Sequence, residues 1–373
     1  MMWQGKEIRE IWEYLSGAGR TVVLYGMGNG ADKIIEVCAK KGIAVQAVFA
    51  SDGFVRGQIF HGERVLSWSE VKAAYGVDNL TVLLSFATSR PEVLENIKRI
   101  AAEAELLAPD VPVFGDTLFD GAFLEAHRSE LEAARELLSD EESRRIFDLV
   151  IEYKLSGDIR PLLAARSDLD QVMKMIVRPE TLGATADLGA YNGDTVRELL
   201  SYGARPQKIY AMEPDARNFR KLSEYAAGED RTKVIPVRAA AWSREETLTF
   251  DASGNRNASA GQNRSAVLDG RPMKTVELPA LPLDTVLSGE AVDYIKYDVE
   301  GSEGEALTGS RETIGRFAPT LMISLYHRSQ DLYEIPLRIR REFPFYQGFY
   351  LRRFGGVPAW DLNFYVTKEK CDG

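Results

Sequence analysis

The sequence predicts an α/β protein with two parallel, helix-covered sheets and a helical segment between them. Strand-like and helix-like segments alternate over about residues 19–119 and again from about residue 178, and such alternation is typical of parallel sheets. Each region opens with a strand, a glycine-rich turn and a helix, in "VVLYGMGNGADKII" and "TADLGAYNGDTVREL". Strand patterns are absent between the two regions. We therefore expect three parts, with bounds 1–119, 120–177 and 178–373.

In the first part, the opening "MMWQGKEIREIWEYL" predicts a charged amphipathic helix and not a secretion signal. Strands are expected at "TVVLYG", "VQAVFASD" and "NLTVLLSFA". Helices are expected at "ADKIIEVCAKKG" and at "RPEVLENIKRIAAEA", which Pro91 opens near its first position. These elements would form a small Rossmann-like α/β domain.

In the middle part, "FLEAHRSELEAARELL" and "EESRRIFDLVIEYKLSG" predict helices, and Ser139–Glu142 gives the second helix a cap and an acidic first turn. In the last part, strands are expected at "ATADLGA", "KIYAMEP", "KVIPVRAAAW", "DYIKYDVEG", "TLMISLYH", "GFYLRRF" and "LNFYVT". Only "GGVPAWD" separates the final two, which predicts an antiparallel pair that closes the sheet. The polar segment 251–266 is expected to be a loop that closes over the acceptor.

The composition limits the classes of partner. A formal net charge of −10 disfavours nucleic acid, and the dense basic run Arg338–Phe343 is expected to be a solvated helix face. Apolar runs fall short of the roughly 18 residues of a membrane span, so no membrane insertion is expected. Cys38 and Cys371 lie far apart in the sequence, which fits neither a disulfide framework nor a zinc site. We expect a cytoplasmic protein.

The second glycine turn predicts a site for S-adenosylmethionine. Its spacing is G-x-x-x-G, from Gly189 to Gly193, whereas dinucleotide sites use G-x-G-x-x-G. Asp187 and Asp194 flank the turn, and carboxylates suit a sulfonium and an ammonium group better than a pyrophosphate. Glu213 ends the next strand, 24 residues after Gly189, where it would accept both ribose hydroxyls.

Other residues are expected around this cofactor. Trp242 follows the third strand, where it would either stack near the adenine or pack in the core. The remaining expected cofactor residues adjoin the strand ends: Ala190, Tyr191, Pro214, Ala240 and Asp298.

Five ordered blocks resemble the FkbM family of S-adenosylmethionine-dependent methyltransferases: "DLGAYNGDT", "IYAMEPDARNFRKL", "LPLDTVL", "DYIKYDVEGSEGEALTGS" and "APTLMISLYHRSQDLYEIP". The resemblance covers roughly Leu182–Thr367, and its most distinctive block is K-x-D-x-E-G-x-E at Lys296–Glu303. It implies a class I methyltransferase fold, seven-stranded with the last strand antiparallel. It also implies methyl transfer to a hydroxyl oxygen of a small-molecule or glycan acceptor.

Charged residues gather at the ends of the fourth and fifth strands of this part. In one interpretation His327 or Asp298 is the general base, while Lys296 and the glutamates order the substrates. In another, Asp298, Glu300 and His327 bind Mg²⁺ or Mn²⁺. In a third, Lys296 pairs with a carboxylate and His327 is a structural residue at a strand end. His61 and His127 have no carboxylate or histidine at ligand spacing and are interpreted as structural.

The first glycine turn matches G-x-G-x-x-A at Gly26, Gly28 and Ala31, and Asp52 closes the following strand. Over about Thr21–Phe60 the chain resembles the Rossmann-like nucleotide- or sugar-binding modules found beside sugar-modifying enzymes. Two roles stay open for the Gly26–Gly30 turn and its unit: binding a nucleotide or nucleotide-sugar, or forming a homo-oligomer. If neither unit is catalytic, the protein would be a nucleotide- or nucleotide-sugar-binding scaffold.

Overall fold

The computed structural model describes residues 1–17, 19–251, 267–268, 271–272 and 275–371. Its first part holds a five-stranded sheet of order β7-β4-β3-β8-β9 in which every pairing is parallel. The strands are β3 (Thr21–Tyr25), β4 (Val45–Ala50), β7 (Leu66–Ser67), β8 (Leu80–Leu84) and β9 (Glu105–Leu107). The helices are α2 (Asn29–Lys40), α3 (Trp68–Tyr75) and α4 (Pro91–Glu103), with a 3₁₀ turn at Asp52–Phe54 and a hairpin of β5 (Ile59–Phe60) and β6 (Glu63–Arg64).

The extreme N-terminus differs from the expected helix. Residues Met2–Trp3 (β1) and Lys6–Glu7 (β2) form an antiparallel hairpin, and helix α1 runs only over Ile11–Gly17. The expectation of one continuous amphipathic helix was therefore wrong. Gln4 and Gly5 both have positive φ, which a helix does not allow, and Trp3 is buried.

The middle part is helical. It contains α5 (Gly121–Ala126), α6 (Arg128–Leu137), α7 (Glu141–Ser156), α8 (Ile159–Ala164) and α9 (Leu169–Val172), then a π-helical turn at Met173–Val177 and a 3₁₀ turn at Pro179–Thr181. The first predicted helix is divided at His127, which caps α6 instead of continuing α5. Asp140 caps α7 by accepting from the backbone N–H of Ser143, and Gly157 ends that helix in the left-handed conformation.

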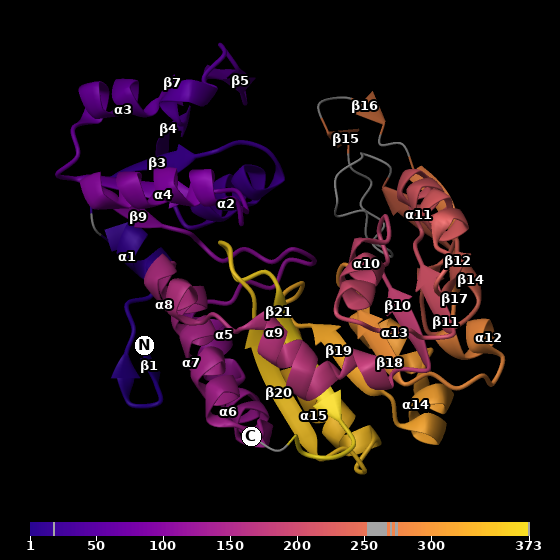
Figure 1. Ribbon diagram of the computed structural model, residues 1–373. Helices are drawn as coiled ribbons and strands as arrows, with labels where there is room; N and C mark the ends of the chain where they lie inside the picture. The colour runs from indigo at the N-terminus through magenta and orange to yellow at the C-terminus, as the bar shows by residue number, and fades with distance from the viewer. Residues whose placement is uncertain (18, 252–266, 269–270, 273–274, 372–373) are drawn as a thin grey trace.

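The last part is built on a seven-stranded sheet of order β12-β11-β10-β18-β19-β21-β20 (Figure 1). The strands are β10 (Ala184–Leu188), β11 (Lys208–Met212), β12 (Lys233–Val237), β18 (Tyr294–Tyr297), β19 (Thr320–Ser324), β20 (Gly348–Arg353) and β21 (Leu362–Thr367). Strand β21 is antiparallel to both of its neighbours and the other pairings are parallel. The predicted seven-stranded sheet with an antiparallel last strand is confirmed.

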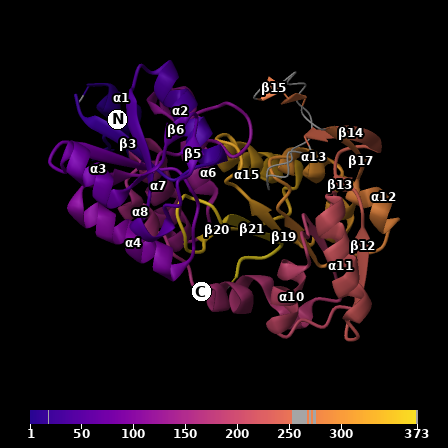
Figure 2. The ribbon, with the colours of Figure 1, turned by 90° about the horizontal axis from the view of Figure 1, so that it is seen from above.

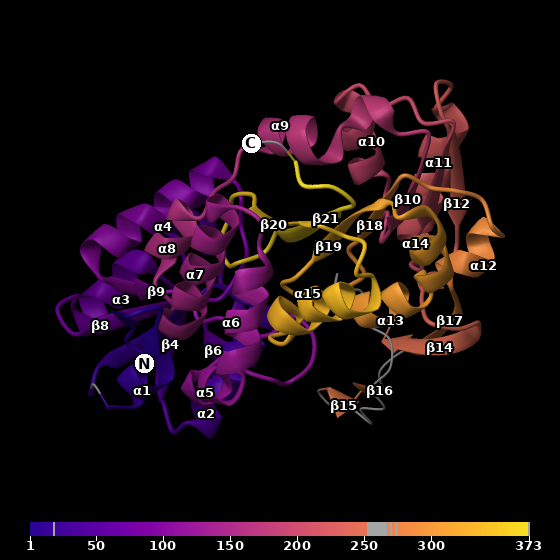
Figure 3. The same ribbon diagram turned by 90° about the horizontal axis from the view of Figure 1, so that it is seen from below.

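Helices cover both faces of this sheet (Figure 3). Helices α10 (Asp194–Ser201) and α11 (Ala216–Gly228) pack with α9 on one face. Helices α13 (Glu303–Thr308), α14 (Arg311–Phe317) and α15 (Asp331–Glu342) cover the other, together with α12 (Leu283–Leu287), α6 and α7. None of the helices in the described ranges is both long and apolar enough to cross a membrane.

A small second sheet lies beside the large one. The predicted strand "KVIPVRAAAW" is two strands, because after β12 the chain leaves the large sheet and enters β13 (Ala240–Ala241). Strand β13 joins β17 (Thr275–Leu281) and β14 (Glu246–Asp251), and β15 (Val267–Leu268) pairs with β16 (Arg271–Pro272). The predicted loop at 251–266 lies, apart from Asp251, outside the described residues.

Helix α7 lies between the sheet of the first part and the β20–β21 edge of the seven-stranded sheet (Figures 1 and 2). Helix α7 belongs to both cores, because Ile146 and Val150 pack into the core of the last part while Tyr153 packs into that of the first. Polar contacts fix the same helix to β20. The backbone N–H of Leu351 donates to Ser143 Oγ at 2.9 Å, and Arg352 pairs with Asp140 at 2.6 Å.

The turn after β10 passes very close to the turn after β18. Gly189 has a φ of +89°, and a Cβ at this position would lie 1.9 Å from the carbonyl oxygen of Asp298. Neither the backbone conformation nor the space admits a side chain. Gly189 therefore fixes the distance between the two strand ends that carry the candidate site.

We expect Gly189→Ala to lower the free energy of unfolding by several kcal/mol, since about 1–2 kcal/mol of left-handed strain adds to a backbone clash. Gly203→Ala is the matched control, because Gly203 has a φ of +90° but nothing within 4 Å of its added Cβ. Urea unfolding of the two variants measures the difference. Equal losses of stability would show that the contact with Asp298 costs nothing.

Candidate active site

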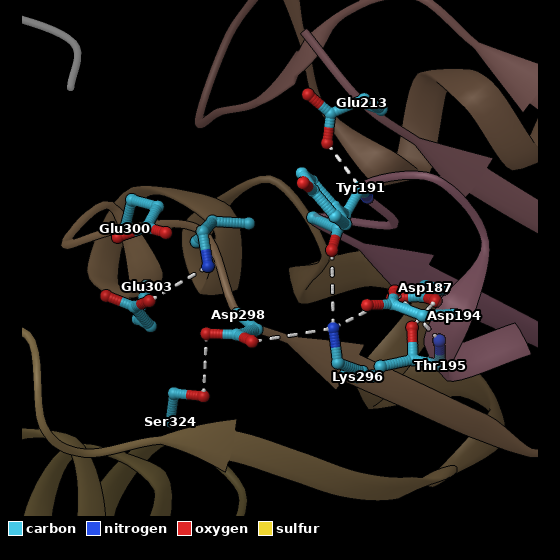
Figure 4. A network of polar contacts seen from close by, with 12 residues as sticks. Asp187, Tyr191, Asp194, Thr195, Glu213, Lys296, Asp298, Glu300, Glu303 and Ser324 are labelled. Carbon is cyan, nitrogen blue, oxygen red and sulfur yellow. Dashed lines mark hydrogen bonds and ion pairs between the residues drawn. The ribbon is translucent and has the colours of Figure 1, made fainter. Parts of the chain in front are cut away.

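A buried lysine lies at the centre of the polar cluster at the carboxyl edge of the seven-stranded sheet (Figure 4). Lys296 Nζ is 3.1 Å from Asp187 Oδ1 and 3.7 Å from Asp298 Oδ2, and it donates to the carbonyl of Gly189 at 3.3 Å. Burial by itself would lower the pKa of Lys296, but the carboxylates of Asp187 and Asp298 outweigh burial and raise it. Lys296 is therefore a charged ammonium that joins the ends of β10 and β18.

Both carboxylate oxygens of Asp187 have partners within the protein. Its Oδ1 faces Lys296, and its Oδ2 accepts from the hydroxyl of Thr195 in the first turn of α10. Asp187 is only 6% exposed. The sequence argument gave Asp187 the role of a free negative charge beside a cationic ligand, but the structure pairs it internally. Asp194 is the exposed carboxylate at this turn, and its Oδ1 accepts from the backbone N–H of Thr195.

Glu213 holds the glycine turn against the end of β11. Its Oε2 accepts from the backbone N–H of Tyr191 and its Oε1 from that of Asp215, both at 2.9 Å. Burial raises the pKa of Glu213 to about 7, although these two backbone donors favour its charged form. Each carboxylate oxygen has a second lone pair, so Glu213 keeps the capacity to accept from ligand hydroxyls. Ala190 is buried in the same turn, and Pro214 follows Glu213 partly exposed.

The glycines of this turn are needed for packing within the protein. A Cβ on Gly193, whose φ is +83°, would lie 2.7 Å from the ring of Tyr225 on α11. Gly189 lies against the backbone of Asp298, as described above. Both glycines therefore allow close contacts with a neighbouring strand end and a helix of the protein itself.

Asp298 is a partly exposed carboxylate of the cluster. Its side chain is 30% exposed, and its Oδ1 accepts from Ser324 Oγ at 3.0 Å and from the hydroxyl of Tyr326 at 2.9 Å. Burial acts to raise its pKa, but Lys296 and His327, with these two donors, lower it below its usual value. Asp298 is therefore an ionised carboxylate held in one orientation.

His327 is completely buried among carboxylates. Its Nδ1 lies 2.8 Å from Glu303 Oε1, and its Nε2 lies 3.5 Å from Glu300 Oε2 and 3.6 Å from Asp298 Oδ1. Neither ring nitrogen is aligned for a hydrogen bond, so these are ion-pair contacts. Burial would lower the pKa of His327, but Glu303 and the other carboxylates more than offset it and raise it to about 9. At neutral pH His327 is an imidazolium.

The described residues contain no group of three or more His, Cys, Asp or Glu side chains arranged to hold a metal ion. The proposed set of Asp298, Glu300 and His327 is therefore not supported. His327 stands at ion-pair distances from both carboxylates, and a charged imidazole does not ligate metals.

Several contacts of the site were not predicted from the sequence. Ser324 and Tyr326 bond to Asp298 from the next strand, and a segment of the first part reaches the loop after β18. The backbone N–H of Phe114 donates to the carbonyl of His327 at 2.9 Å. A Cβ on Gly301 would lie 2.7 Å from Phe114 Cβ. Nothing in the local sequence signals a contact between segments so far apart in the chain.

Trp242 lies beside β13, in the small three-stranded sheet. Its Nε1 donates to Glu246 Oε1 at 2.5 Å, and its partly buried ring packs against the small cluster of Ala240, Leu278 and Ala280. This placement serves local packing, and the stacking role near an adenine stays a prediction.

The glycine turn of the first part also lies close to other residues of the protein. A Cβ on Gly30 would lie 2.3 Å from the carbonyl oxygen of Ser85, and one on Gly26 would lie 2.4 Å from the ring of Phe86. Asp52, the acid expected on a ribose, accepts from the N–H and the hydroxyl of Ser69, both at 2.9 Å. His61 contacts Asp32, 29 residues away in the sequence, with 2.7 Å between Nε2 and Oδ1. The interpretation of His61 as a structural residue stays a prediction.

The last part of the chain is similar to known methyltransferases. Residues 187–350 match the family model described as the methyltransferase FkbM domain. This part of the chain is an FkbM methyltransferase domain. The 2-O-methyltransferase NoeI of Sinorhizobium fredii strain NGR234 is 23% identical over 184 residues, which cover 45% of this chain and 72% of NoeI.

The crystal structure of the methyltransferase FkbM from Methylobacillus flagellatus KT superposes on 95% of this chain and 92% of its own, with a TM-score of 0.69 and 19% identity. At that identity the likeness establishes the fold alone. The FkbM domain therefore has an α/β methyltransferase fold, and the likeness to the solved structure extends over the first part as well.

We expect the imidazole of His327 to titrate near pH 9, against an ordinary value of 6.5. Because the folded pKa is raised, its contribution to stability is full below about pH 6.5 and is lost as the pH rises through about 9. Glu303→Gln should lower the titration midpoint, since it removes the nearest carboxylate.

Histidine NMR measures this directly, because the chain has only three histidines to assign. Glu312→Gln, on the exposed side of α14, is the control that should leave the midpoint unchanged. A midpoint near 6.5 in the unaltered protein would contradict the charged state of His327.

Proposed function

We propose that the protein is an S-adenosylmethionine-dependent O-methyltransferase that acts on a hydroxyl of a sugar, a glycoconjugate or a related small molecule. The observation that carries this proposal is Asp298, an ionised and partly exposed carboxylate at the carboxyl end of β18. Ligands of open α/β sheets bind at that edge. The match of residues 187–350 to the FkbM domain supports methyl transfer, and the distant likeness to a 2-O-methyltransferase supports an oxygen acceptor.

The residues around the second glycine turn fit the methyl donor. S-adenosylmethionine, when bound, supplies an electrophilic methyl group on a sulfonium. Glu213 would accept from its ribose hydroxyls, and the exposed carboxylate of Asp194 lies at the start of α10, near the turn. Asp187 acts indirectly, because it ties α10 and β18 together through Thr195 and Lys296.

Asp298 would accept a hydrogen bond from the acceptor hydroxyl and then take its proton. A lowered pKa makes Asp298 a weak base, but the hydroxyl oxygen becomes strongly acidic as its new bond to carbon forms, so a weak base suffices. Ser324, Tyr326 and Lys296 hold the carboxylate in place during the transfer. Alignment of oxygen, carbon and sulfur is then the main demand on the site.

His327 suits a positioning role better than that of general base. It is 0% exposed, and as an imidazolium it already carries the proton that a base would have to receive. Its charge partly neutralises Glu300, Glu303 and Asp298, which would otherwise repel one another.

We expect Asp298→Asn to lower the rate of methyl transfer about 100-fold or more, the usual effect of removing a proton acceptor. The assay follows labelled methyl groups from S-adenosylmethionine into a panel of sugar glycosides. The exposed Asp230→Asn is the control, which should retain the full rate. An unchanged rate in Asp298→Asn would remove this residue from the mechanism. Donor binding without transfer to any acceptor would favour the non-catalytic scaffold.

We expect Glu213→Gln to weaken binding of S-adenosylhomocysteine about ten-fold, while Glu224→Gln, 70% exposed on α11, has no effect. Isothermal titration measures both. In the unaltered protein, affinity should fall as the pH drops through about 7, because the protonated carboxyl of Glu213 is the weaker acceptor. Equal affinity in the two variants would place the ribose elsewhere.

A further inference from the structure

We propose that a pocket between the first and the last part of the chain binds a second sugar ring of the acceptor, next to the ring that is methylated. We call it the interdomain pocket, and define it by Gly30, Ser85, Pro112, Pro358 and Trp360, which are among its lining residues. The inference rests on the proposed function, since it concerns the acceptor of that reaction.

The size of the interdomain pocket suits a single ring. Its volume is about 260 Å³, below the roughly 300–1,000 Å³ of most small-molecule sites. A dinucleotide needs more room and a carboxylate for its ribose. Asp52, the acid in the expected position, is bound to Ser69. The pocket lies between two parts of the chain, which is a common place for ligand sites.

Both walls of the pocket are fixed by hydrogen bonds. Thr88 and Val357 exchange backbone hydrogen bonds of 2.9 and 3.0 Å, which attach the loop after β20 to the end of the first sheet. Lys33 Nζ donates to the carbonyls of Pro112 and Val113 at 2.7 and 2.6 Å. The pocket is therefore largely formed in the absence of a ligand.

The lining combines an aromatic face with polar groups, which is the chemistry that a sugar ring requires. Trp360 lines the pocket and is 36% exposed, so its indole is available to the C–H face of a pyranose. Asn29 and Ser85 supply hydrogen-bonding groups. Helix α2 begins at the pocket, and Gly28 before it supplies no side-chain cap.

Tyr326 connects the pocket to the candidate active site. Its hydroxyl donates to Asp298 at 2.9 Å, and its ring lies nearly parallel to that of Trp360, with 6.4 Å between centroids. An acceptor whose reactive hydroxyl meets Asp298 would extend along Tyr326, and its next ring would reach Trp360. The first part of the chain would then help to select the acceptor.

The experiment compares Trp360→Ala with unaltered full-length protein on methyl hexosides and on the corresponding methyl disaccharides. We expect KM for the disaccharides to rise about ten-fold, with kcat, the hexoside kinetics and S-adenosylhomocysteine affinity unchanged. Phe54→Ala removes another exposed aromatic, 52% exposed and outside the pocket, and should change nothing. If Trp360→Ala does not fold, Asn29→Ala, on the exposed start of α2, replaces it and should show the same selective rise.

Failure of this inference can be told from failure of the proposed function. Hexoside turnover by the unaltered protein tests the function, and the difference between hexosides and disaccharides tests the pocket. If no acceptor is methylated, binding of the disaccharides to the protein loaded with S-adenosylhomocysteine decides: loss in Trp360→Ala supports the pocket, and no binding overturns it. A disaccharide KM that is the same in Trp360→Ala as in the unaltered protein would also overturn it, as would nucleotide binding that this variant abolishes.

Discussion

The ammonium group of Lys296 is the interaction on which the candidate site depends. Two carboxylates, Asp187 and Asp298, end neighbouring strands and would repel each other in a buried setting without a cation between them. Lys296 also bonds to the carbonyl of Gly189, so the same group fixes the glycine turn. Lys296 thus contacts both Gly189 and Asp298, whose backbones approach each other closely. The glycine turn after β10 and the carboxylate of Asp298 are thus held together.

The charged groups of the site differ in their exposure to solvent. Deep in the sheet edge, Lys296 and the imidazolium of His327 are each enclosed by carboxylates. Towards the surface, Asp298 and Glu300 are 30% and 40% exposed, and carboxylates outnumber cations there. Such a field favours a ligand that carries positive charge and disfavours a phosphate. In the proposed function, the attraction of a sulfonium donor would therefore come from the whole cluster and not from Asp187 alone.

Much of the FkbM domain could be predicted from the sequence, because its parallel strands are short apolar runs that end in polar residues. Lys296, Asp298 and His327 end adjacent strands, so their meeting followed from strand order. The contacts that each site residue makes were harder to predict than its position in the fold. The pairing of Asp187 with Lys296 depends on strand register, and the turn glycines depend on the backbones beside them. The contact of Phe114 with the loop after β18 is between distant segments, and no local pattern encodes it.

The elements that were wrongly predicted have local physical reasons. Glycine at position 5 allows a hairpin where the hydrophobic spacing suggested a helix. His127 stops one helix and starts another because its ring packs on Phe123 and Tyr333. At Gly5 the local backbone conformation outweighs a helical pattern, and at His127 the packing on Tyr333 does.

Helix α7 contributes side chains to the cores on both of its sides, as Ile146 and Tyr153 show. Removing either half of the chain would leave an apolar face of this helix in water. The boundary between the halves is consequently not a place where evolution could exchange one module for another without rebuilding a helix.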